Sequence, residues 1–242
     1  MSLKLMCVVA HPDDECFAFG GALSLAAERG ITTYVVCLTD GQAAKNRGEA
    51  ASGAELGRIR REEFAASCKV LNVSRYELLD YQDAQLEFVD FSKTAAKLVE
   101  RIRQFQPDVV ITFGGEGALN NHPDHTMVSS LTTAAFHWAG KQRRYPEEGE
   151  VFQPRRLFYV TSSFTIPGRP VPLLAPWTVK LDIRAVKEKK FEAFRQHLSQ
   201  APLMEQTKAI FAELGDDEYY TLAAAEPPQA MPMLTDLFEG LA

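Results

Sequence analysis

The chain has 242 residues, of which 46% are hydrophobic, and this is enough apolar material for one α/β domain with a full core. The formal net charge of −6 argues against binding along the phosphate backbone of a nucleic acid. No apolar run is long enough to cross a bilayer. The four cysteines are scattered and no basic leader follows Met1, so we expect a cytoplasmic protein with reduced thiols and no membrane partner.

The first forty residues predict a strand, a helix and a second strand. Residues 3–9 form an apolar strand, and residues 22–29 carry apolar side chains at helical spacing before Gly30. Residues 31–39 are rich in β-branched side chains, which favour a buried strand. A strand, a helix and a strand over this length form a βαβ unit, which implies a parallel sheet.

The same alternation continues through the rest of the chain. Helices are predicted at 56–71, 91–105, 126–138 and 185–198, and strands at 76–79, 108–113, 156–161 and 178–183. We therefore predict a Rossmann-like α/β fold, with a mostly parallel sheet flanked by helices. We expect a single domain over residues 1–242, in which residues 141–242 complete the sheet and the cleft.

Two similar motifs follow apolar strands of this predicted sheet. Residues 10–15 read Ala-His-Pro-Asp-Asp-Glu, and residues 122–125 read His-Pro-Asp-His. Functional residues of an open parallel sheet gather outside the carboxyl ends of its strands, so the two turns can face one crevice. A single motif of this kind is often only a capped turn, and acidic residues also favour helix N-termini. Neither explanation accounts for two such motifs, each with a second ligand-type side chain three positions on.

Imidazole and carboxylate groups together suit zinc, which in catalytic sites takes about three protein ligands. The two motifs hold more groups of this type than one zinc needs. Asp13 is the natural general base, since it neighbours Asp14 and can approach the reacting water from outside the ligand shell. If His122 is not a metal ligand, it can stabilise the oxyanion or protonate the leaving amine, and Asp124 would orient its ring by a hydrogen bond.

The paired motifs resemble the LmbE-like/PIG-L family of zinc-dependent de-N-acetylases, which includes deacetylases of N-acetylglucosaminyl-phosphatidylinositol and of mycothiol and bacillithiol synthesis. The resemblance covers most of residues 3–139 and continues weakly to the His-x-Ser-Gln sequence at 197–200. It implies one zinc per chain, with iron as the alternative, bound by His11, Asp14 and His125. It also implies Asp13 as the general base and His122 as the oxyanion stabiliser, with Asp124 behind it.

The resemblance further implies that Arg60, from an Arg-x-x-Glu helix motif, and Asp83 bind substrate hydroxyls. The alternative for Arg60 is an ion pair with Glu63 on the helix surface. The family has a similar His-x-Ser-Gln sequence, so the resemblance leaves open that His197 is a further site residue, but we expect it to pack its helix end. Glu15 is expected to give structural support. Departures from the family pattern lie in loops that would line the cleft, at Thr39-Asp40-Gly41-Gln42, Leu71-Asn72 and Asn120-Asn121.

The predicted function is hydrolytic removal of an N-acyl group, in the first instance acetyl, from an N-acetylglucosamine-type sugar or its conjugate. Water attacks the amide carbonyl, and Asp13 accepts its proton. Two alternatives stay open at this point. One is an amidase that cleaves thiol-sugar S-conjugates with the same groups, and the other is a non-catalytic sugar-binding domain. The expected partner is a small N-acetylated molecule, and a homo-oligomer is compatible with the sequence.

Overall fold

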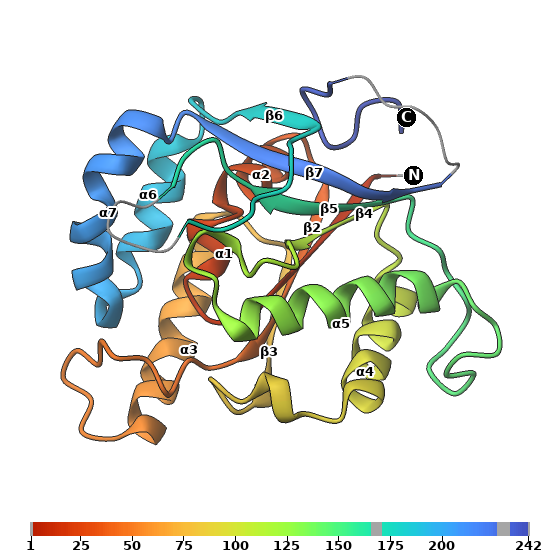
Figure 1. Cartoon of the computed structure of the whole chain (residues 1–242), viewed down its shortest axis with the longest axis horizontal. Coiled ribbons are helices and arrows are strands. Elements are labelled where there is room, and N and C mark those ends of the chain that lie inside the picture. The colour runs from red at the N-terminus through yellow and green to blue at the C-terminus, as the bar shows by residue number, and fades with distance from the viewer. Residues whose placement is uncertain (1, 166–170, 227–232, 242) are drawn as a thin grey trace.

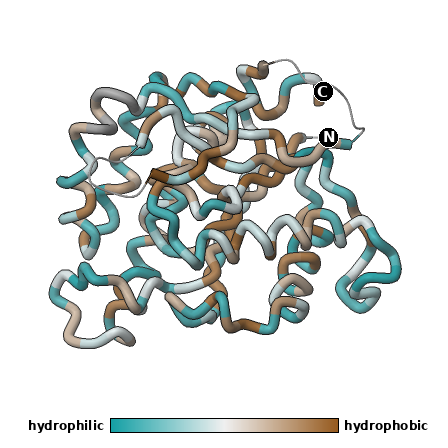
Figure 2. The backbone as a smooth tube through the Cα atoms, viewed as in Figure 1, coloured by the Kyte–Doolittle hydropathy of each residue, from teal (hydrophilic) through white to brown (hydrophobic). Residues whose placement is uncertain are grey.

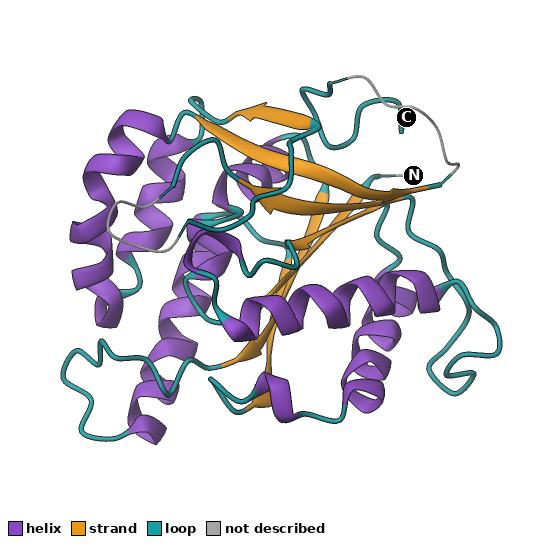
Figure 3. Cartoon of the chain, viewed as in Figure 1, coloured by secondary structure: helices purple, strands orange, loops and turns teal. Residues whose placement is uncertain are grey.

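The computed structural model of the chain describes residues 2–165, 171–226 and 233–241. One seven-stranded sheet passes through the molecule and is flanked by helices (Figures 1 and 3). The strands are β1 (Lys4–Val9), β2 (Thr32–Thr39), β3 (Arg75–Tyr81), β4 (Val109–Phe113), β5 (Arg156–Thr161), β6 (Val179–Asp182) and β7 (Asp217–Ala225). The helices are α1 (Asp14–Phe17), α2 (Gly20–Glu28), α3 (Gly53–Val70), α4 (Phe91–Phe105), α5 (Pro123–Ala139), α6 (Lys187–Arg195) and α7 (Ala201–Leu214).

The strand order across the sheet is β3-β2-β1-β4-β5-β7-β6. The first five strands in this order pair in parallel, and β7 pairs antiparallel with β5 and with β6. The predicted class, a Rossmann-like and mostly parallel sheet flanked by helices, is therefore confirmed. Strand β7 was not predicted, and it inserts between two strands that were.

The order of the strands reverses between β1 and β4. The chain begins in the middle of the sheet with β1, builds outward through β2 to β3, and then returns to place β4 on the other side of β1. In open α/β sheets, ligands bind outside the carboxyl ends of the strands at such a reversal point. The loops after β1 and β4 thus define the place where a site is expected.

The central strands carry the core. Every residue of β4 is buried, as are all residues of β1 after Lys4 and of β2 after Thr32, and Figure 2 shows these apolar segments in the middle of the molecule. Strands buried on both faces need helices on both sides. Helices α4 and α5 pack against each other, and α6 packs against α2 and α3 (Figure 1). No helix within the described part of the chain is long and apolar enough to span a bilayer.

Two helix predictions differ from the structure in a way that matters for the site. The helix predicted at 126–138 begins at Pro123, because proline is well suited to the first turn and His122 accepts the Asp124 N–H as its N-cap. The helix predicted at 185–198 ends at Arg195, and a 3₁₀ turn, η3, covers Leu198–Gln200. His197 lies between them with φ −85° and ψ 68°, which are not helical angles.

Candidate active site

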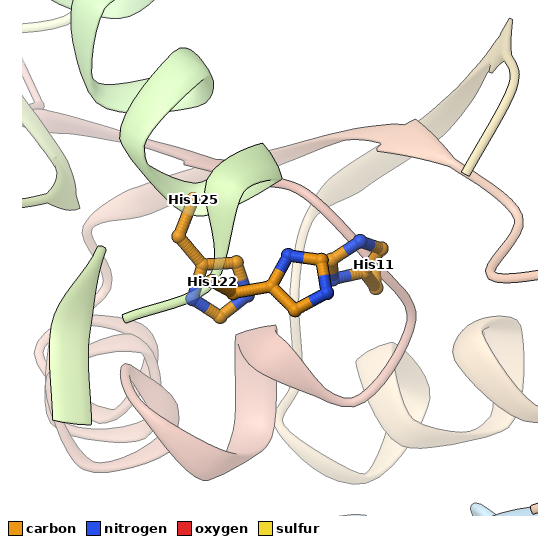
Figure 4. Close-up of side chains that lie close together, drawn as sticks. All are labelled: His11, His122 and His125. Atoms are coloured by element: carbon orange, nitrogen blue, oxygen red, sulfur yellow. The ribbon is translucent and has the colours of Figure 1, made fainter. Parts of the chain in front are cut away.

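The loops at the reversal point bring the two motifs together. His11 follows β1, while His122 and His125 stand at the start of α5, which follows β4. The three rings meet face to edge or at a tilt (Figure 4), with centroids 4.8 Å apart for His11 and His122, 5.3 Å for His11 and His125, and 5.1 Å for His122 and His125. Residues more than a hundred positions apart thus form one cluster.

Asp14 lies between two of these rings. Its Oδ2 accepts the backbone N–H of His11 at 2.8 Å and lies 3.5 Å from His11 Nδ1. Its Oδ1 lies 3.2 Å from His125 Nε2. The His125 ring is in turn stacked on Phe113, with centroids 4.0 Å apart. The three residues predicted as metal ligands therefore contact one another, and a carboxylate joins the two imidazoles.

The residue types present fit a divalent metal. Each of the three histidines offers a nitrogen within 4.8 Å of the others, and a second group of this kind comprises His11, Asp83 and Asp124. His125 Nδ1 is buried and has no hydrogen-bond partner among the described residues. Buried imidazole and carboxylate groups at this density are typical of a metal centre. A third group of this kind is formed by Glu15, Cys16 and His197, and all three residues are buried.

Asp13 adopts an unusual backbone conformation beside these residues. Its φ of 101° lies in the left-handed region, which a residue with a Cβ rarely enters. Arg60 Nη2 donates to Asp13 Oδ2 at 2.8 Å and also to the carbonyl of Pro12, and Nη1 donates to the carbonyl of Gly41 at 3.1 Å. Burial raises the pKa of Asp13 to about 6, and the Arg60 guanidinium opposes this rise.

The prediction that Arg60 binds a substrate hydroxyl stays untested, but the structure shows another partner for it. The side chain is 4% exposed and its guanidinium holds the predicted base, although it also lines the cavity. The alternative, a surface ion pair with Glu63, is wrong: the Glu63 carboxylate instead accepts the backbone N–H and the Oγ–H of Ser199, both at 2.7 Å. Sequence spacing placed Arg60 and Glu63 on one helix face but could not show which distant residues they meet.

Asp83 and Asp124 both face His11. Asp83 Oδ1 lies 3.0 Å and Asp124 Oδ2 lies 3.2 Å from His11 Nε2. Burial lowers the pKa of His11, but hydrogen bonds to Asp124, Asp14 and Asp83 outweigh it, so that this pKa lies well above its ordinary value. Asp83 also accepts the N–H of Ala43 at 2.9 Å and lines the cavity.

The carboxylate of Asp124 does not contact His122 as expected. It accepts the backbone N–H groups of Ala84 at 2.7 Å and Leu86 at 3.2 Å, which turn it toward His11. The link to His122 is through the backbone instead, since the N–H of Asp124 donates to His122 Nδ1 at 3.2 Å. Burial, together with the neighbouring rings of His11 and His125, lowers the pKa of His122.

A cavity of about 1000 Å³ opens over the cluster. The predicted residues that line it are His11, Asp13, Asp14, Arg60, Asp83, His122 and His125. Residues of the C-terminal part, which the sequence did not single out, form part of the remaining wall, and they include Phe164, Leu174, Leu203 and Tyr219. Tyr219 belongs to the unpredicted β7, whose paired tyrosines were the only signal, and its neighbour Tyr220 is fully buried.

The comparisons with known proteins concern the sequence and the fold. Residues 6–136 match the PIG-L family, described as GlcNAc-PI de-N-acetylase. Mycothiol S-conjugate amidase of Streptomyces coelicolor is 31% identical over 65% of this chain, and the match spans 60% of that protein's length. Diacetylchitobiose deacetylase of Thermococcus kodakarensis is 29% identical over 82% of this chain and 70% of its own.

Among solved structures, 4-carboxy-2-hydroxymuconate hydratase of Pseudomonas putida superposes with a TM-score of 0.76 at 22% identity. The superposition covers 95% of this chain and 99% of that one. At this identity the likeness concerns the fold alone, because one fold hosts many reactions and a function resides in its site.

Proposed function

Because this chain belongs to the PIG-L family, we propose that it is a metal-dependent hydrolase that removes an N-acyl group from an amino sugar or its conjugate. Acetyl on an N-acetylglucosamine-type sugar is the first candidate. The observation that carries the proposal is the convergence of both motifs at one reversal point, with Asp14 between His11 and His125 under a large cavity. The family of de-N-acetylases and the diacetylchitobiose deacetylase relative support the reaction type.

One metal ion per chain, zinc in the first instance and iron as the alternative, would be held by His11, Asp14 and His125. When bound, such an ion would act as a Lewis acid that polarises a carbonyl. It would also lower the pKa of water to roughly 7. The three side chains come from two separate loops, so the metal site exists only in the folded sheet.

Asp13 accepts the proton of the attacking water. Arg60 fixes one oxygen of its carboxylate at 2.8 Å, which leaves the other oxygen for the water. Arg60 thus acts on the reaction through Asp13, while Asp83 is the residue proposed to meet a substrate hydroxyl.

His122 stabilises the oxyanion. Its Nδ1 accepts the N–H of Asp124, so in the neutral ring the proton resides on Nε2. That N–H is then free to donate to the negative charge that develops on the amide oxygen. Asp124 contributes through its backbone N–H to this ring and through its carboxylate to His11.

The size of the cavity favours a conjugate over a single sugar. At about 1000 Å³ it is at the upper end of small-ligand pockets. The ligand-type side chains gather at the histidine cluster, and the rest of the lining mixes apolar residues such as Phe164 and Leu203 with polar ones such as Asn46, Ser162 and Gln206. We place the sugar amide at the cluster and the rest of the conjugate in the remainder of the cavity.

An amidase that acts on a thiol-sugar S-conjugate is the second candidate. The specific observation in its favour is the 31% identity to a mycothiol S-conjugate amidase. The chemistry is the same in both cases, because each reaction hydrolyses an amide on an amino sugar. The two candidates differ only in the acyl group and in what fills the cavity beyond the histidine cluster.

The test is amine release from a panel of substrates by zinc-loaded and iron-loaded protein. The panel contains N-acetylglucosamine, diacetylchitobiose, N-acetylglucosamine conjugates and a thiol-sugar S-conjugate. Preferred release of acetate from the N-acetyl compounds supports the first candidate, and preferred cleavage of the S-conjugate supports the second. Metal-loaded protein that binds these sugars but releases no amine would overturn both and leave a non-catalytic binding domain.

A further inference from the structure

Two fully buried ionisable residues, Glu15 and His197, are linked by hydrogen bonds to the backbone of Asp13. Glu15 is at the start of α1, and His197 is in the segment between α6 and η3, 182 positions later. Both side chains have no exposed surface, and neither residue lines the cavity. His197 Nε2 contacts Glu15 Oε1 at 2.8 Å, and among the described residues no hydrogen bond or ion pair joins His197 to His11, His122 or His125.

The backbone of Asp13 is held by Glu15. The left-handed conformation of Asp13 persists only where its surroundings enforce it. Its N–H donates to Glu15 Oε2 at 2.8 Å, and its carbonyl accepts the N–H of Phe17 at 2.9 Å and the Sγ–H of Cys16 at 3.1 Å. The first of these bonds is accepted by a carboxylate at the end of a side chain, so it depends on where the Glu15 carboxylate is fixed.

The Glu15 carboxylate is fixed in turn from its other oxygen. Its Oε1 contacts His197 Nε2 and accepts the hydroxyl of Ser67. A buried carboxylate is costly to leave without a hydrogen-bond partner, because it is shielded from bulk solvent. His197 and Ser67 together hold Oε1, and the other oxygen of the same carboxylate accepts the Asp13 N–H.

We propose that Glu15 and His197 form a positioning pair that holds Asp13 in its left-handed conformation and so aims its carboxylate at the reacting water. The catalytic part of this inference rests on the proposed function, whereas the conformational part does not. It assigns to the C-terminal half of the chain a share in the geometry of a base that lies in the N-terminal half.

A matched control exists two residues away. Ser199 is also buried, follows His197 in the same segment, and donates its hydroxyl to Glu63 on α3 at 2.7 Å. This bond ties the segment to the body of the protein as the His197 bond does, but it does not contact Glu15 or Asp13. Ser199→Ala thus measures the cost of loosening the segment without releasing Asp13.

The first experiment follows hydrogen exchange of the Asp13 amide in metal-free protein by NMR. We expect His197→Ala to speed this exchange about tenfold or more, because the acceptor Oε2 is no longer held. His197→Gln, whose amide restores a donor to Glu15, should return it toward the wild-type rate. Ser199→Ala should leave it unchanged. Equal exchange in His197→Ala and Ser199→Ala would overturn the proposal.

The second experiment compares kcat and KM of the metal-loaded variants on the best substrate. We expect His197→Ala to lower kcat about 10- to 100-fold with KM little changed and metal content intact, as for the loss of an orienting partner. His197→Gln should recover much of kcat, and Ser199→Ala should keep it. A kcat that falls equally in His197→Ala and Ser199→Ala would mean a merely structural role and would overturn the positioning role.

If His197→Ala does not fold, Glu15→Gln takes its place, since an amide cannot accept from Asp13, Ser67 and His197 together, and the same exchange and kcat results are expected. If the wild-type protein is inactive on every substrate, the proposed function fails. The exchange of the Asp13 amide then still supports or overturns the positioning of Asp13 by Glu15 and His197.

Discussion

At the scale of single residues, the site divides its acids by their partners. Asp14 contacts two imidazoles, Asp83 and Asp124 contact His11, and the Asp13 carboxylate contacts the guanidinium of Arg60. A carboxylate that is paired with imidazoles suits metal binding, whereas one that is held from a single side keeps an oxygen for a proton. The contacts therefore separate Asp13, the proposed base, from Asp14, the one aspartate among the proposed metal ligands.

Replacing the base tests this separation. Asp13→Asn keeps the size and the Arg60 contact of the side chain but cannot accept a proton, so we expect kcat to fall about 100- to 10,000-fold. Metal content, measured by elemental analysis, should stay at one ion per chain. The matched control is Asp80→Asn, on a side chain that is 90% exposed. Turnover at the wild-type rate in Asp13→Asn would remove Asp13 from the role of base.

At the scale of elements, close packing between helix α2 and the C-terminal strands supports the loop that carries the first motif. The N–H groups of Gly21 and Ala22 donate to the two oxygens of Glu218 on β7, at 2.7 and 2.9 Å. A Cβ on Gly21 would come within 2.5 Å of Ile183 and 2.7 Å of Glu218. Helix α2 can approach β7 this closely only because residue 21 has no side chain.

We therefore expect Gly21→Ala to lower the free energy of unfolding by about 1–3 kcal/mol, as overpacking does. Gly115→Ala is the control, since a Cβ there meets nothing within 4 Å. Urea unfolding of the two variants measures the difference. Equal stabilities would show that α2 and β7 can move apart at little cost.

A second contact between elements should depend on pH. Glu77 on β3 accepts from Arg101 Nε on α4 at 2.6 Å and from the hydroxyl of Tyr34 on β2. Burial raises the pKa of Glu77, but the bonds from Arg101 and Tyr34 outweigh it, so that the folded pKa lies below the ordinary 4.5. A lowered folded pKa contributes stability above pH 4.5, and this stability is lost as the pH falls through the folded value.

Glu77→Gln should accordingly reduce the free energy of unfolding by about 1 kcal/mol near neutral pH. The difference from the wild type should shrink as the pH falls below 4.5 and through the lowered folded pKa of Glu77, because the carboxylate then becomes protonated in both states. Denaturant unfolding at several pH values measures it. A difference that stays constant with pH would assign the effect to packing and not to charge.

Strands and motifs were predictable where the signal is local. The apolar runs of β1 and β4 and the ligand-type residues after them are readable from adjacent positions, and the structure places them as expected. Strand β7 was missed because its sequence, Asp-Glu-Tyr-Tyr-Thr-Leu-Ala-Ala-Ala, begins with acids and ends in alanines, which favour strands weakly. It becomes a strand through its pairing with β5 and β6.

At the scale of the whole molecule, the partners of the site residues were not predictable. That Arg60 meets Asp13, that Asp124 turns to His11, and that His197 meets Glu15 are contacts across 47, 113 and 182 positions. Such contacts depend on how the layers pack, which a local pattern does not encode. The prediction of one domain over residues 1–242 stays a prediction, and the shared sheet favours it.

Metal removal tests the site as a unit. Chelation should abolish turnover and lower Tm, because an ion that binds only the folded state stabilises it by mass action, by about 2.7 kcal/mol at a hundredfold excess over Kd. Readdition of zinc or iron should restore both, and His125→Ala should remove the response of Tm to metal. Thermal unfolding with and without metal measures it. A Tm that is insensitive to metal in the wild-type protein would argue against a site formed by these residues.

The reversal of strand order also sets when the site can arise during folding. Strands β1 and β4 are direct neighbours in the sheet, but the residues that pair between them, such as Leu5 and Val109, are far apart in the chain. Closing so long a loop is entropically costly and slow. Until these strands pair, His11 and His125 belong to separate parts of a fluctuating chain. A refolding chain should therefore gain helix and strand signals before it takes up metal. Metal uptake would then report that the centre of the sheet is complete, and the proposed ion would stabilise the fold at a late stage of folding and would not nucleate it.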